Sequence, residues 1–259
     1  MSELFVFFPV YDEGSSAPAL VERLDAACTR LGRPFRLLAV DDGSTDGSGA
    51  RLAALARERP LTVLSHEGNR GLAAALSTGI AWLCREAGDG DVVVMMDGDD
   101  THDPACLPGM LAALDAGAEL VVASRFRAGA EIRGVPFSRQ LLSRVASRLG
   151  RLRFRVPDLT DYSSGYRAVR ARALKAAAPH FLERAPALER RGFACALELL
   201  LLLAESAGGV AGVTGVTEVP IVLRYDRKQC PSSMSALRTV LGTLALLTGR
   251  RPASTRSSR

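Results

Sequence analysis

Short apolar runs that stop at polar, turn-forming residues alternate with helical stretches along the first half of this 259-residue chain. The runs that we expect to be buried strands are residues 4–8, 35–40, 61–64, 92–96 and 120–123. Apolar residues at helical spacing lie between them, at residues 17–31, 45–59, 71–86 and from Asp103-Pro104 onward. This alternation predicts a mostly parallel sheet covered by helices, in an α/β protein whose first half is Rossmann-like.

Acidic and aromatic side chains gather where three of the predicted strands end. The first strand leads into Tyr11 and Glu13, the second into Asp42, and the run at 92–96 into Asp97 and Asp99. Ligands of open α/β sheets bind at the carboxyl ends of parallel strands, so we expect one crevice there. Alternate residues share a face and carboxylates suit Mg²⁺ or Mn²⁺, which favours a metal site over a solvated turn.

Composition and missing motifs exclude several other classes. The chain has neither a G-x-G-x-x-G fingerprint nor a Walker loop, which argues against dinucleotide and P-loop proteins. The net charge is +5, but aromatic residues make up only 5% and no nucleic-acid-binding motif is present, so no nucleic-acid partner is expected. The five cysteines form no C-x-x-C pair, which fits a reducing cytoplasm. Neither a signal peptide nor a membrane-spanning run is predicted.

The second half of the chain is rich in arginine and contains one basic amphipathic stretch. Its apolar residues recur at helical spacing and are Leu141, Leu142, Val145, Leu149 and Leu152. Packing of this stripe on the sheet is the expected interpretation, because most amphipathic helices are core helices. The alternative is a helix that lies on anionic lipid headgroups.

Five further features complete the pattern. Residues 193–204 predict a core helix and residues 217–223 a late strand. Residues 234–248 predict a helix that would cover the domain, form a homodimer or touch a bilayer, and residues 252–259 a disordered tail. His102, which follows the carboxylates, is expected to be a polar turn residue, with a role at the edge of the site as the alternative.

Several motifs resemble those of glycosyltransferase family 2, with the greatest likeness to dolichyl-phosphate mannosyltransferase and other polyprenyl-phosphate glycosyltransferases. Residues 9–13 are similar to the opening P-x-Y-N-E motif, residues 41–46 to the second signature, and Asp97-Gly98-Asp99 to the D-x-D motif. Further matches lie at residues 69–71, 124–126, 138–139, 163–167 and 192–198. The resemblance implies a GT-A glycosyltransferase domain over residues 1–234, followed by a C-terminal helix and disordered tail in residues 235–259.

The resemblance also implies an inverting, metal-dependent transfer of sugar from a GDP- or UDP-sugar to a polyprenyl phosphate, at the cytoplasmic face of a membrane. It assigns Mg²⁺ or Mn²⁺ to Asp97, Asp99 and Thr101. It assigns the nucleotide to Pro9, Tyr11, Glu13, Asp42, Asp97, Gly98, Asp99 and Arg227. It places Arg125, Arg139 and Arg227 at the donor or acceptor phosphate. The candidate catalytic residues are Asp99, Arg125, Arg139 and Asp161.

The acceptor is the part of this assignment that the sequence leaves most open. Relatives often end in R-x-x-G-x-S-K, whereas here Cys230 replaces Gly and Ser233 replaces Lys, with Lys228 as a possible substitute cation. A phosphate acceptor is already a nucleophile, but a soluble hydroxyl acceptor needs a base, for which Asp161 is the candidate. A non-catalytic nucleotide-sugar binding protein is the other alternative, and the missing Q-x-x-R-W motif argues against polymer synthesis.

Overall fold

The computed structural model describes residues 2–189, 194–208 and 215–228. The strands of the central sheet are β1 (Leu4–Val10), β2 (Phe35–Asp41), β3 (Leu61–Ser65), β4 (Val92–Met95), β5 (Leu120–Ser124), β7 (Arg167–Arg170) and β8 (Val216–Pro220). A second, two-stranded sheet pairs β6 (Glu131–Arg133) with β9 (Val222–Arg224). The α-helices are α1 (Ser16–Arg30), α2 (Ser48–Leu55), α3 (Leu72–Glu86), α4 (Leu107–Asp115), α5 (Phe137–Phe154), α6 (Ala171–Leu188) and α7 (Ala194–Ser206). Short 3₁₀ turns are η1 (Pro104–Cys106) and η3 (Tyr225–Arg227).

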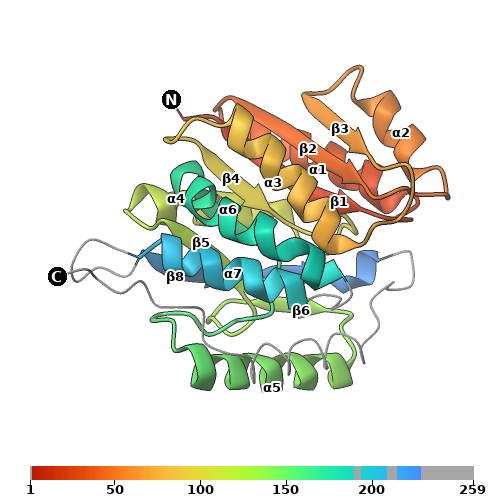
Figure 1. Cartoon of the computed structure of the whole chain (residues 1–259). Coiled ribbons are helices and arrows are strands. Elements are labelled where there is room, and N and C mark those ends of the chain that lie inside the picture. The colour runs from red at the N-terminus through yellow and green to blue at the C-terminus, as the bar shows by residue number, and fades with distance from the viewer. Residues whose placement is uncertain (1, 190–193, 209–214, 229–259) are drawn as a thin grey trace.

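The central sheet has the order β3-β2-β1-β4-β7-β5-β8. All pairs are parallel except those of β7, which runs antiparallel to both of its neighbours. The expectation of a mostly parallel sheet in an α/β protein is therefore confirmed. Figure 1 shows the sheet between its helices, with α5 lying apart along one edge of the molecule.

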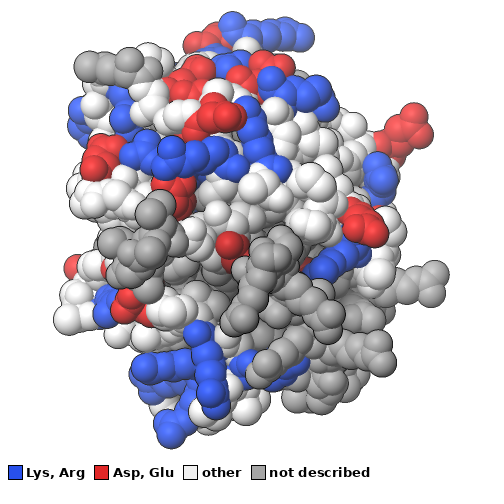
Figure 2. Space-filling view, turned by 60° about the vertical axis from the view of Figure 1, so that its left-hand side comes forward, with Lys and Arg blue, Asp and Glu red and all other residues white. Residues whose placement is uncertain are grey.

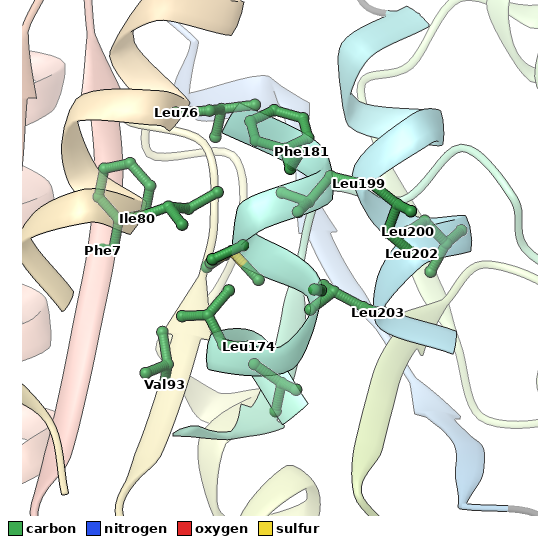
Figure 3. Packing of buried hydrophobic residues seen from close by; sticks show 14 of the residues in the cluster. Phe7, Leu76, Ile80, Val93, Leu174, Phe181, Leu199, Leu200, Leu202 and Leu203 are labelled. Atoms are coloured by element: carbon green, nitrogen blue, oxygen red, sulfur yellow. The ribbon is translucent and has the colours of Figure 1, made fainter. Parts of the chain in front are cut away.

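Helices cover both faces of the sheet, and each face has its own apolar core. Phe5 and Phe7 of β1 face α3, α6 and α7, while Leu4, Val6 and Phe8 face α1, α2 and α4. This alternation along one strand is the period of two that a sheet buried on both faces requires. Figure 3 shows the first core, in which Phe7 and Ile80 pack toward Phe181 and the leucines of α7.

Strand register brings the ends of β1, β2 and β4 to one edge. Val10 pairs with Asp41 across β1 and β2, and Phe7 pairs with Met95 across β1 and β4. The backbone N–H of Met96 continues the ladder by donating to the carbonyl of Phe7 at 3.0 Å. The loops that follow these three strands therefore start side by side, as the sequence predicted.

Two predicted elements differ from the observed ones. The helix expected over residues 45–59 is shorter, because Gly47 takes a left-handed conformation with φ +86° and α2 begins only after it. The strand expected over residues 217–223 is divided between β8 and β9, which belong to different sheets. The break follows Pro220, where the Ile221 N–H still donates to the Ser124 carbonyl of β5 at 3.0 Å before the chain pairs with β6.

The prediction that the basic amphipathic helix packs its apolar stripe on the sheet is wrong. The helix exists as α5, but its apolar stripe, Leu141, Leu142, Val145, Leu149 and Leu152, remains 40% to 65% exposed. The buried residues of α5 are Ser147 and Gly150, and a Cβ added to Gly150 would lie 2.8 Å from the Tyr162 ring. The helix thus contacts the rest of the domain through Ser147 and Gly150. These small side chains leave room for the Tyr162 ring close to the helix backbone.

Gly79 in α3 is expected to be intolerant of alanine. A Cβ at this position would lie 2.3 Å from the Phe7 ring, in the fully buried core. We expect Gly79→Ala to lower the free energy of unfolding by about 1–3 kcal/mol through overpacking, measured by urea denaturation. Gly109 in α4 is the matched control, because nothing lies within 4 Å of its added Cβ. Gly109→Ala should be neutral or slightly stabilising, and equal effects at both sites would contradict the packing argument.

The predictions for residues 229–233, 234–248 and 252–259 lie outside the described residues. Within the ranges that the structure does describe, no helix combines the length and hydrophobicity needed to cross a bilayer.

Candidate active site

The D-x-D loop closes tightly on the end of β1. A Cβ added to Gly98 would lie 2.4 Å from the carbonyl oxygen of Pro9, so only glycine permits this approach. The backbone N–H of Asp97 donates to His102 Nδ1 at 3.1 Å, and His102 Nε2 lies 3.8 Å from Asp97 Oδ2. His102 is buried and stacked on Tyr166, so it supports the carboxylate loop instead of being a polar turn residue.

Asp99 is held by three contacts within this loop and its surroundings. The Thr101 hydroxyl donates to Asp99 Oδ1 at 2.7 Å and the Thr101 N–H donates to the same oxygen at 3.1 Å. The other carboxylate oxygen forms an ion pair with the ammonium group of Lys228. Thr101 therefore orients Asp99, while its role as a metal ligand stays a prediction.

The two carboxylates of the motif differ in their electrostatics. Burial raises the pKa of the Asp97 carboxyl. His102 lowers this pKa and the negative charge of Asp99 raises it, and the net shift is upward. Burial also raises the pKa of Asp99, but the charge and hydrogen bond of Lys228 outweigh it, so this pKa lies below the usual value. Asp99 is therefore the carboxyl group of the pair that loses its proton more readily in the metal-free protein.

These residues fit a divalent cation that is shared with a ligand. Among the described residues, no three His, Cys, Asp or Glu side chains converge into a ligand set. Mg²⁺ commonly binds through one or two carboxylates and completes its shell with water and substrate phosphates. The Lys228 ammonium on Asp99 shows that this position accepts a cation. Asp97 and Asp99 would supply the protein ligands.

Glu13 is a third carboxyl group whose charge interacts with those of the D-x-D motif. Its Oε2 atom is buried and has no hydrogen-bond partner in the described structure. Burial is the main cause that raises the pKa of Glu13 to about 7, and the charges of Asp99 and Asp97 also raise it, while Lys228 lowers it. Near neutral pH, Glu13 is therefore divided between its protonated and charged forms.

The pKa of Glu13 predicts a pH-dependent stability. Because the folded pKa lies above the unfolded value of 4.5, stability is lost as pH rises through about 7. By pH 8 we expect Glu13→Gln to be more stable than wild type by about 1 kcal/mol, after allowance for solvent screening, and equal to it at pH 4. Urea denaturation in EDTA measures this, with the exposed Glu22→Gln as control. A constant difference between pH 4 and 8 would contradict the prediction.

The loops after β1 and β2 are tied together by acidic side chains. Asp12 takes a left-handed conformation with φ +51° and its Oδ1 accepts from the Thr45 N–H at 2.7 Å. Asn and Asp adopt this conformation more readily than other side chains, which suits the Asn of the P-x-Y-N-E motif that residues 9–13 resemble. Tyr11, between Asp12 and the strand, is half-buried.

Asp42 is engaged by a buried histidine and by the loop before α3. Its Oδ1 atom lies 2.6 Å from His66 Nδ1 and accepts from the Arg70 N–H at 3.0 Å, and its Oδ2 accepts from the Gly71 N–H at 2.7 Å. His66 Nε2 in turn lies 2.9 Å from the Thr78 hydroxyl. No local pattern in the sequence marks His66 as a functional residue, since its partners lie 24 and 12 residues away.

Two predicted catalytic residues, Arg125 and Asp161, form one buried pair. Arg125 Nε donates to Asp161 Oδ2 at 2.8 Å and Nη2 donates to Oδ1 at 2.6 Å. Burial raises the pKa of Asp161, but the hydrogen bonds and charge of Arg125 outweigh it and hold the pKa below its usual value. Such a carboxylate accepts a proton poorly, so it is a weak candidate for a general base.

The remaining predicted arginines, Arg139 and Arg227, have different partners. Arg139 Nη1 donates to the Tyr225 hydroxyl at 2.8 Å, and Lys228 Nζ lies 5.9 Å from the centre of the same ring. Arg227 Nη1 lies 3.1 Å from Asp103 Oδ2. Tyr225 therefore connects α5 to the lysine that contacts the D-x-D motif, a link that the sequence analysis did not predict.

The arrangement of this chain is that of GT-A glycosyltransferases. It is similar to glucosyl-3-phosphoglycerate synthase from Mycobacterium tuberculosis, with TM-score 0.62 and 18% identity over 94% of this chain and 79% of that chain. Mannosyl-3-phosphoglycerate synthase from Rubrobacter xylanophilus gives 0.61 and 16%, over 95% and 72%. At such identities the likeness shows the fold alone. A structure of the M. tuberculosis enzyme was solved with Mg²⁺ and UDP.

Sequence similarity defines the family. The profile of Glycosyl transferase family 2 matches residues 5–177, and the chain belongs to this family. It is 37% identical to polyprenol monophosphomannose synthase of Mycolicibacterium smegmatis, over 66% of this chain and 62% of that protein. It is 31% identical to dolichol-phosphate mannosyltransferase of Pyrococcus furiosus, over 64% and 45%. The match to undecaprenyl-phosphate mannosyltransferase of Micrococcus luteus is 34%, over 67% and 68%.

Proposed function

We propose that this protein is an inverting glycosyltransferase that moves a sugar from a GDP- or UDP-sugar to a polyprenyl phosphate, with Mg²⁺ or Mn²⁺ as cofactor. The observation that carries the proposal is the position of the Asp97 and Asp99 carboxylates after β4, in a loop that closes on Pro9 at the end of β1 and whose charge acts on Glu13. The relatives named above, which include enzymes for polyprenol, dolichol phosphate and undecaprenyl phosphate, support the acceptor class. The aligned part covers 45% to 68% of their length.

The proposed roles follow from the geometry. When bound, the divalent ion would stabilise the negative charge that develops on the diphosphate leaving group. Asp97 and Asp99 hold that ion, and Thr101 keeps Asp99 in place. The nucleotide is assigned to the side chains and backbone of Pro9, Tyr11, Glu13, Asp42, Gly98 and Arg227.

A phosphate acceptor fits this site better than a soluble hydroxyl acceptor. A hydroxyl must lose a proton to a positioned base, and the predicted base, Asp161, is already bound by Arg125 with a lowered pKa. A phosphate monoester carries about −1.5 to −2 charges at pH 7 and needs no base. Arg139 belongs to α5 and donates to the Tyr225 hydroxyl, and it is the arginine that we assign to the acceptor phosphate.

We also propose that α5 holds the enzyme against the cytoplasmic face of the membrane. Phe137 is 72% exposed at its start, and the apolar stripe continues along the helix. Arginines occupy much of the remaining surface, and Figure 2 shows basic side chains gathered at the end of the molecule where α5 lies in Figure 1. Apolar side chains beside arginines match a surface of lipid chains and anionic headgroups.

Replacing two leucines of α5 should release the protein from vesicles. We expect Leu149→Gln with Leu152→Gln to reduce co-sedimentation with anionic vesicles at least tenfold, because both side chains are exposed on the proposed contact face. Leu182→Gln is the control, since Leu182 is also exposed but belongs to α6. Loss of binding in both variants, or in neither, would contradict the assignment of α5.

The reaction itself is tested with a panel of GDP-, UDP- and dTDP-sugars and Mn²⁺, with and without a short-chain polyprenyl phosphate. Nucleotide release and glycolipid formation are followed together. Glycolipid formed from one donor supports the proposal and identifies the donor. Nucleotide release to a saccharide or alcohol, without glycolipid, would assign a soluble acceptor. Donor binding with no transfer to any acceptor would indicate a nucleotide-sugar binding protein.

A further inference from the structure

We propose that Lys228 has two alternating partners: Asp99 in the metal-free protein, and the diphosphate of the donor once a divalent ion has taken its place. This inference rests on the proposed function, because it names a residue of the same donor site. The family motifs do not assign Lys228, which precedes the altered end of the R-x-x-G-x-S-K pattern.

The first partner is seen directly. The Lys228 ammonium contacts Asp99 Oδ2, and both side chains are nearly buried, with 10% and 12% of their surfaces exposed. The other Asp99 oxygen is used by Thr101. Lys228 therefore occupies the carboxylate oxygen that is available to a metal ion. A divalent ion bound there would repel the ammonium group at a distance of a few ångströms.

The second partner follows from what holds the lysine near the site. The Arg224 N–H donates to the Thr101 carbonyl at 2.7 Å, and Leu223 forms a β-bridge with His102, so the chain leading to Lys228 is attached to the D-x-D loop. The Lys228 N–H donates to the Tyr225 carbonyl at 3.2 Å. The backbone is thus fixed, while the four-carbon side chain can turn.

Charge decides where the ammonium moves. The charges of Asp97 and Glu13 also act on Lys228, so acidic groups remain near the ammonium when the metal displaces it from Asp99. The diphosphate enters together with the metal and provides new oxygen acceptors at this place. Lysine is a common phosphate ligand because its ammonium group is a compact charge with three donors. Lys228 therefore changes from a competitor of the metal to a ligand of the donor.

The test measures two affinities of Lys228→Met. Mn²⁺ alone, titrated by the EPR signal of the free ion, should bind about tenfold tighter than in wild type, because the competing charge is gone. At saturating Mn²⁺, UDP and GDP should bind about ten- to a hundredfold more weakly, while uridine and guanosine, which lack phosphate, are unaffected. Lys228→Gln gives the same readouts should the Met variant not fold.

Arg224→Met is the matched control, because Arg224 lies on the same segment but pairs with the exposed Asp226. It should leave both affinities unchanged. A purely structural ion pair would leave the diphosphate affinity of Lys228→Met at the wild-type value, and that result would overturn the inference. Unchanged Mn²⁺ affinity would overturn it as well. Wild-type protein that binds neither UDP nor GDP would instead contradict the proposed function.

Discussion

Replacing both carboxylates of the D-x-D motif by amides, Asp97→Asn with Asp99→Asn, is expected to lower turnover by at least a thousandfold. The change removes the two protein ligands of the divalent ion and about 4 kcal/mol of transition-state stabilisation. It keeps side-chain size, and an amide oxygen at position 99 can still accept from Thr101. The fold should therefore survive. Turnover is measured as nucleotide release at saturating donor and acceptor.

The same double variant should lose the effect of metal on nucleotide binding. Wild-type protein is expected to bind UDP or GDP more tightly when Mn²⁺ is added, whereas the variant should bind equally with Mn²⁺ and with EDTA. Asp89→Asn is the control, because Asp89 is 75% exposed and pairs with Lys175 away from the motif. Unchanged turnover in the double variant would refute the metal role of Asp97 and Asp99.

Arg125→Ala is expected to cause the largest loss of stability, about 3–5 kcal/mol. The Asp161 side chain has no exposed surface and relies on two hydrogen bonds from the Arg125 guanidinium. Removing the guanidinium leaves a buried carboxylate that keeps its hydrogen bonds from Ser163 and from the backbone N–H of residue 125 but loses its ion-pair partner. The free energy of unfolding is measured by urea denaturation at pH 7.

Two further variants distinguish the stability loss caused by breaking the buried pair from the loss caused by removing any arginine. Arg133→Ala removes an arginine whose partner Glu131 is more than half exposed, and it should change stability by no more than about 0.5 kcal/mol. Asp161→Asn in the Arg125→Ala background should recover part of the loss, because it removes the unpaired charge. Equal losses for Arg125→Ala and Arg133→Ala would contradict the assigned role of burial.

The buried pair also decides which arginine variant tests the acceptor site. Arg125 is one partner of an internal ion pair, so a loss of activity in Arg125→Ala would combine loss of structure with loss of chemistry. Arg139 is held by the Tyr225 hydroxyl and contacts no carboxylate among the described pairs. Arg139→Ala is therefore the clearer test of the acceptor side, with glycolipid formation as its readout.

The amino-acid sequence alone determined strands β1 to β5 of the central sheet and the position of the D-x-D motif. Continuous apolar runs such as residues 4–8 and 92–96 are typical of strands that are buried on both faces. Such a strand can be predicted from its own residues, without knowing which strands it pairs with. The carboxylates follow directly in the chain, so their place at the sheet edge follows from strand direction. Local pattern and strand polarity are sufficient for both conclusions.

Tertiary structure decided which polar groups meet and which face of α5 is covered. Lys228 and Asp99 are 129 residues apart, and Arg125 and Asp161 are 36 apart, so no spacing rule connects them. The apolar stripe of α5 has the same period whether it packs on a sheet or faces outward, and the contact of Gly150 with Tyr162 selects the second arrangement. Periodicity gives the shape of a helix, whereas its neighbours depend on contacts between distant parts of the chain.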